Sequence, residues 1–177
     1  MLTKKYENEL KQWRHDFHEN PELNFDVKET AAKVTELLKD FGLEVHTNIG
    51  GTGVVGVLKK GTSAKSIGIR ADMDALPITE LNDFSYKSKN VGKMHACGHD
   101  GHTAMALGAA KYLAESGTFD GTAHFIFQPD EEATEGAQAM IDDGLFEKFK
   151  IDEVYAFHNL PGLPTGKFAS RTGAITG

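Results

Sequence analysis

Hydrophobic residues recur every three or four positions along the first forty residues, which is the spacing of amphipathic helices. This pattern predicts one helix that ends at Asn20-Pro21 and a second that runs from a cap at Asp26 to Gly42. The side chains expected to face the interior are Leu2, Tyr6, Leu10, Trp13 and Phe17 in the first helix and Ala31, Val34, Leu38 and Phe41 in the second.

From residue 43 the pattern changes to short apolar runs bounded by glycine, proline or charged residues, which is typical of strands. Strands are predicted at residues 43–49, 54–58, 67–71, 122–128 and 154–157, with residues 167–170 as a further candidate. Helices are predicted over residues 103–114 and from residue 137 to about residue 144, and a loop over residues 77–94.

Strands that alternate with helices predict an α/β fold with a mixed, largely parallel sheet flanked by helices. The 177 residues suffice for one domain with its own core, and neither a repeat nor a linker indicates a boundary inside the chain. Residues 171–177 read like a strand or loop in mid-course, so we expect the domain to be incomplete at its C-terminus.

Composition narrows the range of functions. The formal charge of −7 and the lack of a basic run argue against a nucleic-acid partner. A single cysteine excludes an internal disulfide framework, which favours a reducing compartment. Neither a signal peptide nor a membrane-spanning run is visible, so we expect a soluble cytoplasmic protein with no membrane partner.

Residues 95–102 concentrate groups that bind metals. They contain the only cysteine, three histidines and an aspartate within eight positions. Because thiolate and imidazole are preferred ligands of borderline-soft divalent metals, Cys97 and His99 are candidate ligands. Further candidates each follow a predicted strand: Asp72 and Asp74, Glu131 and Glu132, and His158. Side chains beyond the carboxyl ends of parallel strands converge, so the sequence predicts a metal hydrolase.

Each candidate has a structural alternative. Cys97 would be a small apolar core residue in other surroundings, although its neighbours here are polar and glycine-rich. Asp72 and Asp74 are also suited to cap a turn before a proline, and Glu131 and Glu132 to begin a solvated helix. The remaining histidines are expected to support the ligands or contact a substrate (His95 and His102), or to be structural or at the surface (His15, His18, His46 and His124).

Two other functions match parts of the chain. Gly51-Thr-Gly-Val-Val-Gly56 has the glycine spacing of a dinucleotide-binding loop, but the residues after its third glycine leave no room for the helix that should begin there. The stronger rival is a hydrolase that uses Cys97 as the nucleophile with a histidine base. That mechanism leaves Glu131, Glu132 and His158 unexplained.

Five ordered motifs resemble the amidohydrolase branch of the aminoacylase and carboxypeptidase metallopeptidases, which includes hippurate hydrolases, auxin-conjugate hydrolases and N-acetyl-diaminopimelate deacetylases. The resemblance runs from about residue 10 to the last residue, and the order of five motifs makes it specific. The motifs are Trp13-Arg-His-Asp-Phe-His-Glu-Asn-Pro-Glu-Leu23, Arg70-Ala-Asp-Met-Asp-Ala-Leu-Pro77, Met94-His-Ala-Cys-Gly-His-Asp-Gly-His102, Phe127-Gln-Pro-Asp-Glu-Glu132 and His158-Asn-Leu-Pro161.

The resemblance implies hydrolysis of a small N-acyl amino acid with two divalent metal ions, zinc or manganese in the first place and cobalt or nickel as alternatives. In this sequence Glu131 matches the general base that deprotonates water, and Asp74 matches a carboxylate that supports the ligands. The positions that match metal ligands are Cys97, His99, Glu132 and His158.

The chain departs from the family in two ways. The family usually has alanine where this chain has Asp130, which adds a negative charge beside Glu131. Family members are also considerably longer, with a lid and dimerisation domain and a further histidine ligand. We therefore expect residues 1–177 to be the N-terminal part of the catalytic domain, without the lid and the rest of that domain. The full-length form is expected to be a homodimer or homotetramer. A metal-binding fragment without catalysis is the remaining alternative.

Overall fold

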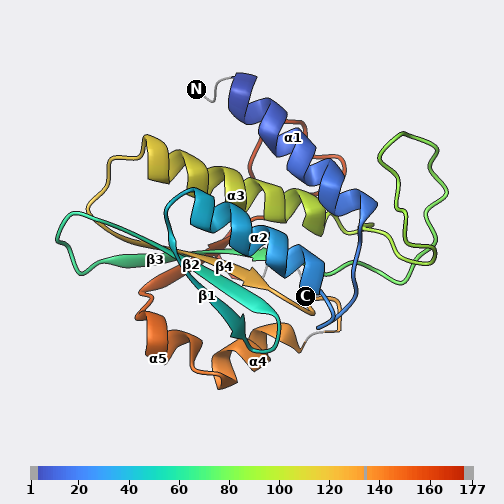
Figure 1. The fold of residues 1–177 in the computed structure, drawn as a ribbon. Coiled ribbons are helices and arrows are strands. Elements are labelled where there is room, and N and C mark those ends of the chain that lie inside the picture. Colours follow the sequence, from blue (N-terminus) through green and yellow to red (C-terminus); the bar gives the residue numbers. More distant parts are fainter. Residues whose placement is uncertain (1–3, 134, 174–177) are drawn as a thin grey trace.

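The computed structural model describes residues 4–133 and 135–173 and shows a sheet between two layers of helices (Figure 1). In chain order the elements are α1 (Lys4–Glu19), α2 (Lys28–Asp40), β1 (Glu44–Ile49), β2 (Gly53–Lys60), β3 (Ser66–Asp72), α3 (His99–Glu115), β4 (Gly121–Gln128), α4 (Gly136–Asp142), α5 (Leu145–Phe149) and β5 (Glu153–Ala156).

The strands of the described residues lie in the order β1-β2-β4-β3-β5. The pairs β1–β2 and β2–β4 are antiparallel, whereas β3 is parallel to both of its neighbours, β4 and β5. The sheet is therefore mixed, as predicted, with parallel and antiparallel pairings in equal number rather than a parallel majority. Because β3, β4 and β5 run in the same direction, their carboxyl ends meet at one edge of the sheet.

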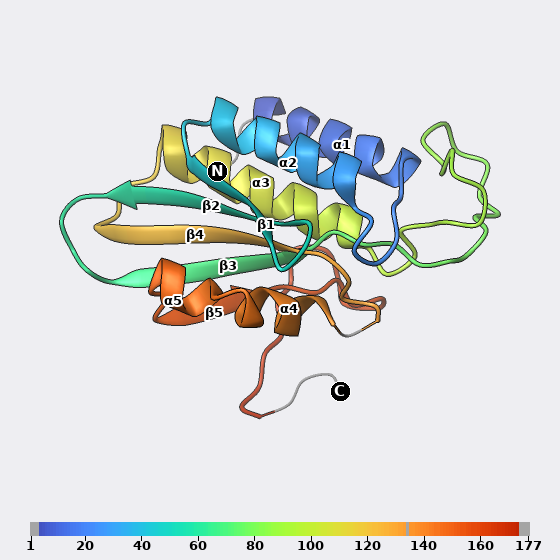
Figure 2. The same cartoon turned by 60° about the horizontal axis from the view of Figure 1, so that its bottom comes forward.

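Helices α1, α2 and α3 cover one face of the sheet, and α4 and α5 cover the other (Figure 2). Successive residues of β4 point to opposite faces, so Phe125 and Phe127 contribute to the core beneath α2 and α3. Ile126 points to the other face and packs with Met140 of α4. Burial of both faces explains why β4 is apolar along most of its length rather than alternating.

The predicted inner faces of the first two helices are confirmed where the structure describes them. Trp13 and Phe17 of α1 and Val34 and Leu38 of α2 are buried in the core. Leu2 lies outside the described residues.

The predicted cap of α2 was wrong. The N-cap residue is Val27, without a side-chain hydrogen bond, rather than Asp26. The carboxylate of Glu22 accepts hydrogen bonds from the backbone N–H groups of Glu29 (3.1 Å) and Thr30 (2.8 Å) and so satisfies the free end of the helix. A cap supplied from several residues away has no local sequence pattern.

Three further differences concern where a helix begins and which elements form. Helix α3 begins at His99 rather than at residue 103, so part of the metal-binding motif forms its first turn. The five-residue helix α5 was missed because it is too short to show a period. Residues 167–170 form no strand.

The glycine-rich segment is part of a strand. Gly56 lies inside β2, opposite Phe125. The helix that a dinucleotide-binding loop requires after its third glycine is therefore not formed there, and this geometry excludes that kind of site.

Two long segments lie outside the layers. Residues 77–93 contain no helix or strand, as predicted, and extend beyond one end of the sheet (Figure 1). Residues 157–173, which follow β5, are exposed throughout. None of the helices in the described part of the chain combines the length and apolar character needed to cross a membrane.

Candidate metal centre

The candidate site lies at the edge of the sheet where the parallel strands end. Asp72 is the last residue of β3, the acidic pair at 131–132 follows β4, and His158 follows β5. Helix α3 begins at the same edge and contributes His99 from its first turn. Strand direction thus brings together side chains that are far apart in the sequence, as the general rule for α/β sheets predicts.

His99 is the residue common to all the close groupings. Its Nε2 atom lies 3.7 Å from Glu131 Oε2 and 3.7 Å from Glu132 Oε1. Cys97 Sγ lies 3.3 Å from His158 Nε2. One potential ligand atom from each of Cys97, His99 and His158 falls within 4.8 Å of the others, and the same holds for His99, Glu131 and Glu132. The structure therefore brings the predicted ligands and the predicted base into one cluster.

Several buried polar atoms in this cluster lack a hydrogen-bond partner among the described residues. His99 is fully buried, yet its Nε2 atom is unpaired, and so is Glu132 Oε1. Burying such atoms without a partner is costly, so a native protein normally satisfies them. A thiol, imidazoles and carboxylates whose free lone pairs lie this close together fit a divalent cation of the zinc or manganese type.

A glycine shapes the turn between Cys97, which precedes α3, and His99, which is the first residue of that helix. Gly98 is the N-cap residue and has a φ of 99°, in the left-handed region that favours glycine. A Cβ atom at Gly98 would lie 2.4 Å from Asn159 Oδ1, so the loop after β5 approaches the backbone closely here. The turn places Cys97 and His99 on either side of this contact and explains the glycine at position 98.

Asp74 contacts two residues of the cluster, His99 and Glu132. Its side chain is fully buried, with Oδ1 lying 3.3 Å from His99 Nδ1. Its Oδ2 atom accepts a hydrogen bond of 3.0 Å from the backbone N–H of Glu132. Burial alone would raise the pKa of Asp74, but the contacts with His99 and Glu132 lower it, so the carboxyl is ionised at neutral pH. Asp74 therefore contacts both the His99 ring and the backbone of the acidic pair.

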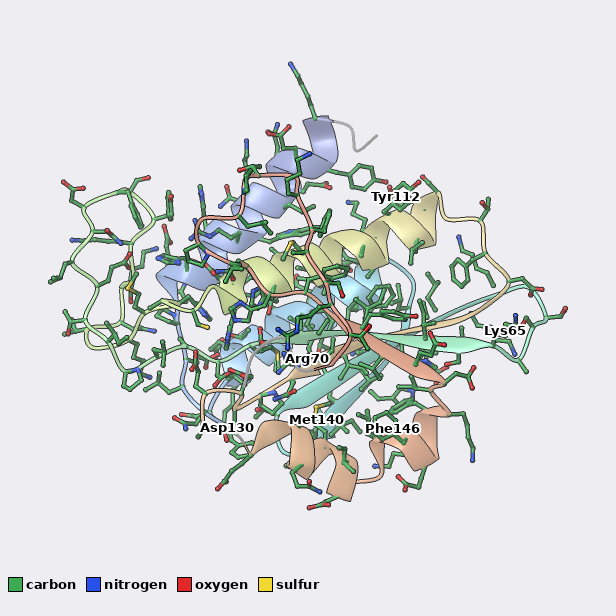
Figure 3. The ribbon with its side chains drawn as sticks, turned by 180° about the vertical axis from the view of Figure 1, so that it is seen from behind. Lys65, Arg70, Tyr112, Asp130, Met140 and Phe146 are labelled. Carbon is green, nitrogen blue, oxygen red and sulfur yellow. The ribbon has the colours of Figure 1, made fainter. Side chains whose placement is uncertain are left out.

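Asp72 belongs to a second set of contacts beside the first. Oδ1 lies 2.6 Å from His102 Nδ1, and Oδ2 accepts a hydrogen bond of 2.7 Å from Arg70 Nη1. Burial favours the neutral acid, but the hydrogen bond with His102 and the charges of His99 and Arg70 lower the pKa of Asp72 to about 2. Figure 3 shows Arg70 on the side of the sheet seen from behind. Sequence analysis missed Arg70, although its position two residues before Asp72 in a strand puts both on one face.

Cys97 is held as a neutral thiol by its surroundings. Burial and the negative charge of Glu132 raise the pKa of the thiol to about 12. The positive end of α3 favours a thiolate, but burial and the full negative charges of the nearby carboxylates outweigh it. A divalent cation reverses this balance, because it stabilises the thiolate directly. Without one, Cys97 is poorly suited to the nucleophile of a cysteine hydrolase.

Two polar residues near the cluster are buried without partners. Both carboxylate oxygens of Asp130 and both ring nitrogens of His95 lack hydrogen-bond partners among the described residues. Asp130 has a φ of 50°, and Figure 3 shows it beside the beginning of α4. Burial lowers the pKa of His95 to about 4, so its ring is neutral at pH 7. Neither residue belongs to the close groupings of potential ligands.

The other histidines are structural or partly exposed, as predicted. His18 is buried between Asp100 and Glu80, and His124 is buried beside Ser66. His15 stacks on Tyr86 of the 77–94 loop.

These features define an α/β protein with a candidate metal centre at the carboxyl ends of its parallel strands. The chain belongs to peptidase family M20/M25/M40, whose description matches residues 68–175. This membership agrees with the resemblance seen in the five motifs.

Individual relatives support the same assignment. The chain is 56% identical over 169 residues to the hippurate hydrolase of Campylobacter jejuni, an alignment that covers 96% of this chain and 44% of that protein. A putative aminohydrolase from methicillin-resistant Staphylococcus aureus superposes with a TM-score of 0.87 at 42% identity and covers 93% of this chain and 44% of its own. A dinuclear metal binding peptidase of the M20 family from Bacillus subtilis superposes with a TM-score of 0.85 at 38% sequence identity. The match covers 92% of this chain and 45% of that protein. The chain thus spans less than half of each of these proteins.

Proposed function

We propose that this chain provides the metal centre of a metal-dependent amidohydrolase that cleaves N-acyl amino acids. The observation that carries the proposal is the convergence of potential ligand atoms on His99 in three groups, which add Cys97 and His158, Glu131 and Glu132, and Asp72 and His102. Membership of the M20 family, and the dinuclear metal binding peptidase among the solved structures that resemble this chain, support two ions.

The geometry supports different tasks for the neighbouring glutamates. The Glu132 side chain is 23% exposed and has one buried oxygen without a hydrogen-bond partner among the residues that the structure describes, which suits a ligand. The Glu131 side chain is 39% exposed, so it can reach water and substrate that arrive from solvent. We therefore assign the general base to Glu131 and the ligand roles to four residues: Cys97, His99, Glu132 and His158.

Divalent ions bound here would acidify water and polarise the amide carbonyl of the substrate. Glu131 would accept a proton from the attacking water and return it to the nitrogen of the departing amine. Asp74 keeps the His99 ring and the Glu132 backbone in place while the proton moves. A thiolate ligand favours zinc, and the carboxylates also suit manganese, with cobalt and nickel as alternatives.

The substrate class follows from the relatives and is part of the proposal. The name hippurate hydrolase describes cleavage of N-benzoylglycine, a small N-acyl amino acid. We place residues 1–177 as the N-terminal part of the catalytic domain and attribute the lid, a further ligand and dimer or tetramer formation to the remaining length of such proteins. The single free cysteine fits a cytoplasmic location.

Metal binding and hydrolysis are best tested on separate proteins. Bound metal is measured by mass spectrometry on the 177-residue chain after loading with zinc or manganese and gel filtration. Hydrolysis of N-benzoylglycine is measured on a chimaera in which this chain replaces the equivalent region of the Campylobacter jejuni hippurate hydrolase. We expect metal in both proteins and chelator-sensitive cleavage in the chimaera.

Two of the unfavourable results would each point to a rival function. A chimaera that is folded and loaded with metal but does not cleave N-acyl amino acids would leave a metal-binding fragment without catalysis. Cleavage that persists after complete removal of metal by a chelator would point to the Cys97 nucleophile instead. Absence of metal from both proteins would end the proposal.

A further inference from the structure

The segment that carries His158 is attached to the rest of the protein at few points. Residues 157–173 are exposed throughout, and Figure 2 shows this segment extending away from the layered body after β5. Among the described residues, its side-chain hydrogen bonds to other elements are made by His158 and Asn159. The position of His158 therefore depends on a very small set of contacts.

Asn159 makes most of those contacts. Its side-chain oxygen lies 2.6 Å from His102 Nε2, which donates to that oxygen when it carries the proton, and its backbone nitrogen lies 3.2 Å from the same ring atom. The same oxygen lies against the backbone of Gly98, where only a hydrogen atom fits. The Asn159 carbonyl oxygen lies 2.7 Å from His158 Nδ1. That last contact leaves His158 Nε2 free to face Cys97.

His102, in turn, is fixed from the interior of the sheet. Its Nδ1 atom lies 2.6 Å from Asp72 Oδ1, and both side chains are buried. Arg70 holds the other oxygen of Asp72 at 2.7 Å, and its Nε atom donates to Gln128 of β4 at 2.9 Å. A continuous series of contacts thus runs from β4 through β3 and α3 to the loop after β5.

We propose that His102 and Asn159 are positioning residues that dock the loop after β5, so that His158 meets Cys97 in the metal centre. The inference rests on the proposed function, because it takes Cys97 and His158 as ligands. It adds a task for Asn159 and for His102, which forms a third group of potential ligand atoms with Asp72 and His99 but has its two ring nitrogens against Asp72 and Asn159.

The energetic reason is the cost of ordering an exposed segment. Each ordered backbone residue loses conformational entropy, and a segment without a buried apolar face recovers little of the free energy that this costs. Hydrogen bonds to a rigid, buried partner such as His102 offset that loss locally. Removing a group that orients a ligand typically weakens metal affinity by roughly tenfold to a hundredfold.

The test measures the dissociation constant of Co²⁺ for the 177-residue chain, with the thiolate-to-cobalt absorption band as the readout. Asn159→Ala should weaken Co²⁺ binding by roughly tenfold to a hundredfold. At saturating Co²⁺ the band should still appear, because Cys97 is intact. The matched control is Leu160→Ala, a neighbouring exposed side chain of the same loop, which should bind Co²⁺ like the parent. Asn159→Asp keeps an oxygen facing His102 and should bind within about threefold of the parent.

A double-mutant cycle separates positioning from general damage. If His102 and Asn159 act through each other, His102→Gln combined with Asn159→Ala should weaken binding no more than the stronger single variant. Losses that multiply, or an Asn159→Ala chain that binds Co²⁺ as tightly as the parent, would overturn the positioning roles and leave the metal centre standing. A parent chain that binds no Co²⁺, or shows no thiolate band, overturns the proposed function itself.

Discussion

Cys97 shows how strongly the state of one residue depends on a cation. In the protein without an ion, burial and Glu132 raise the pKa of its thiol to about 12, well above the ordinary value near 9. The reactive thiolate is then scarce at neutral pH. We predict that iodoacetamide modifies Cys97 in the metal-free chain far more slowly at pH 8 than it modifies a free cysteine, and that the rate keeps rising up to about pH 12. A rate that levels off near pH 8 or 9 would contradict the raised pKa.

Replacement of Cys97 tests its importance as a ligand. In the chimaera with the hippurate hydrolase, Cys97→Ala should lower metal content and hydrolysis together, because the thiolate is the softest ligand of the cluster. Metal content is measured by mass spectrometry and activity with N-benzoylglycine on the same preparation. Full metal occupancy with parental activity would show that Cys97 only fills space.

The two glutamates should respond differently to loss of charge. Glu131→Gln in the chimaera should retain its metal while the rate falls on the order of a hundredfold or more, as expected when a general base is removed. Glu132→Gln should lose metal first, because its buried oxygen then has no charge to offer. Both variants keep the side-chain volume, so metal content and rate are compared directly. The reverse pattern would exchange the two roles.

At the level of single residues, the sequence was sufficient to predict which residues gather in the cluster but not all of the residues that contact them. His158 was recognisable because it follows a predicted strand, and Cys97 and His99 because the only cysteine and three histidines lie within eight positions. Asn159 and Arg70 were not, because asparagine and arginine are common in loops and on strand surfaces. Their roles depend on which partner they meet, and that follows only from the fold.

At the level of elements, one histidine links three parts of the chain. His18 of α1 lies 2.7 Å from Asp100 Oδ2 at the start of α3 and 3.1 Å from Glu80 Oε1 in the 77–94 loop. The hydrogen bond with Asp100 raises the pKa of His18 above 6.5, although burial opposes it. A raised folded-state pKa means that the contribution to stability is complete below pH 6.5 and is lost as the pH rises through the folded-state value.

The carboxyl groups of Asp100 and Glu80 determine the pH below which this contribution to stability is lost. Burial raises the pKa values of Asp100 and Glu80, but hydrogen bonds outweigh burial and lower both. Their contribution is therefore present above their ordinary pKa values near 4 and is lost as the pH falls through the lowered ones. His18→Gln should reduce the free energy of unfolding by about 2 kcal/mol between pH 5 and 6.5, the size of a hydrogen bond to a charged group, and by less at higher pH.

Urea unfolding of the parent and the variant at several pH values measures this difference. The matched control is His15→Gln. His15 also belongs to α1, and this change removes its stacking on Tyr86 of the loop. A loss of equal size for His18→Gln at all pH values would show that its charge does not matter.

The elements themselves were largely predictable, and the exceptions have local causes. Apolar periodicity indicated α1, α2 and every strand from β1 to β5. The first turn of α3 was missed because glycine and histidine are weak helix formers, and the fold imposes the helix there. Residues 167–170 were a candidate for a further strand, but they form none in the structure.

At the level of the whole molecule, the sheet ends in an exposed apolar edge. Strand β5 pairs with β3 on one side only, and Val154 and Tyr155 are about half exposed, as is Phe157 beyond the strand. Exposed strand edges with apolar side chains favour association. We predict that the 177-residue chain self-associates in a concentration-dependent way and that Val154→Lys reduces this, as measured by sedimentation velocity. Tyr112→Lys on α3, where the tyrosine is similarly exposed, is the control. Equal association of all three proteins would rule out β5 as the contact.

The pairing of the parallel strands also makes the metal centre a link between distant parts of the chain. Cys97 and His158 are 61 positions apart, and closing a loop of that length costs conformational entropy. Strand β5 pairs with β3, which in turn pairs with β4. An ion held by Cys97 and His158 would therefore cross-link the segment after β5 to the segment before α3, and its binding would stabilise the attachment of β5 to the sheet.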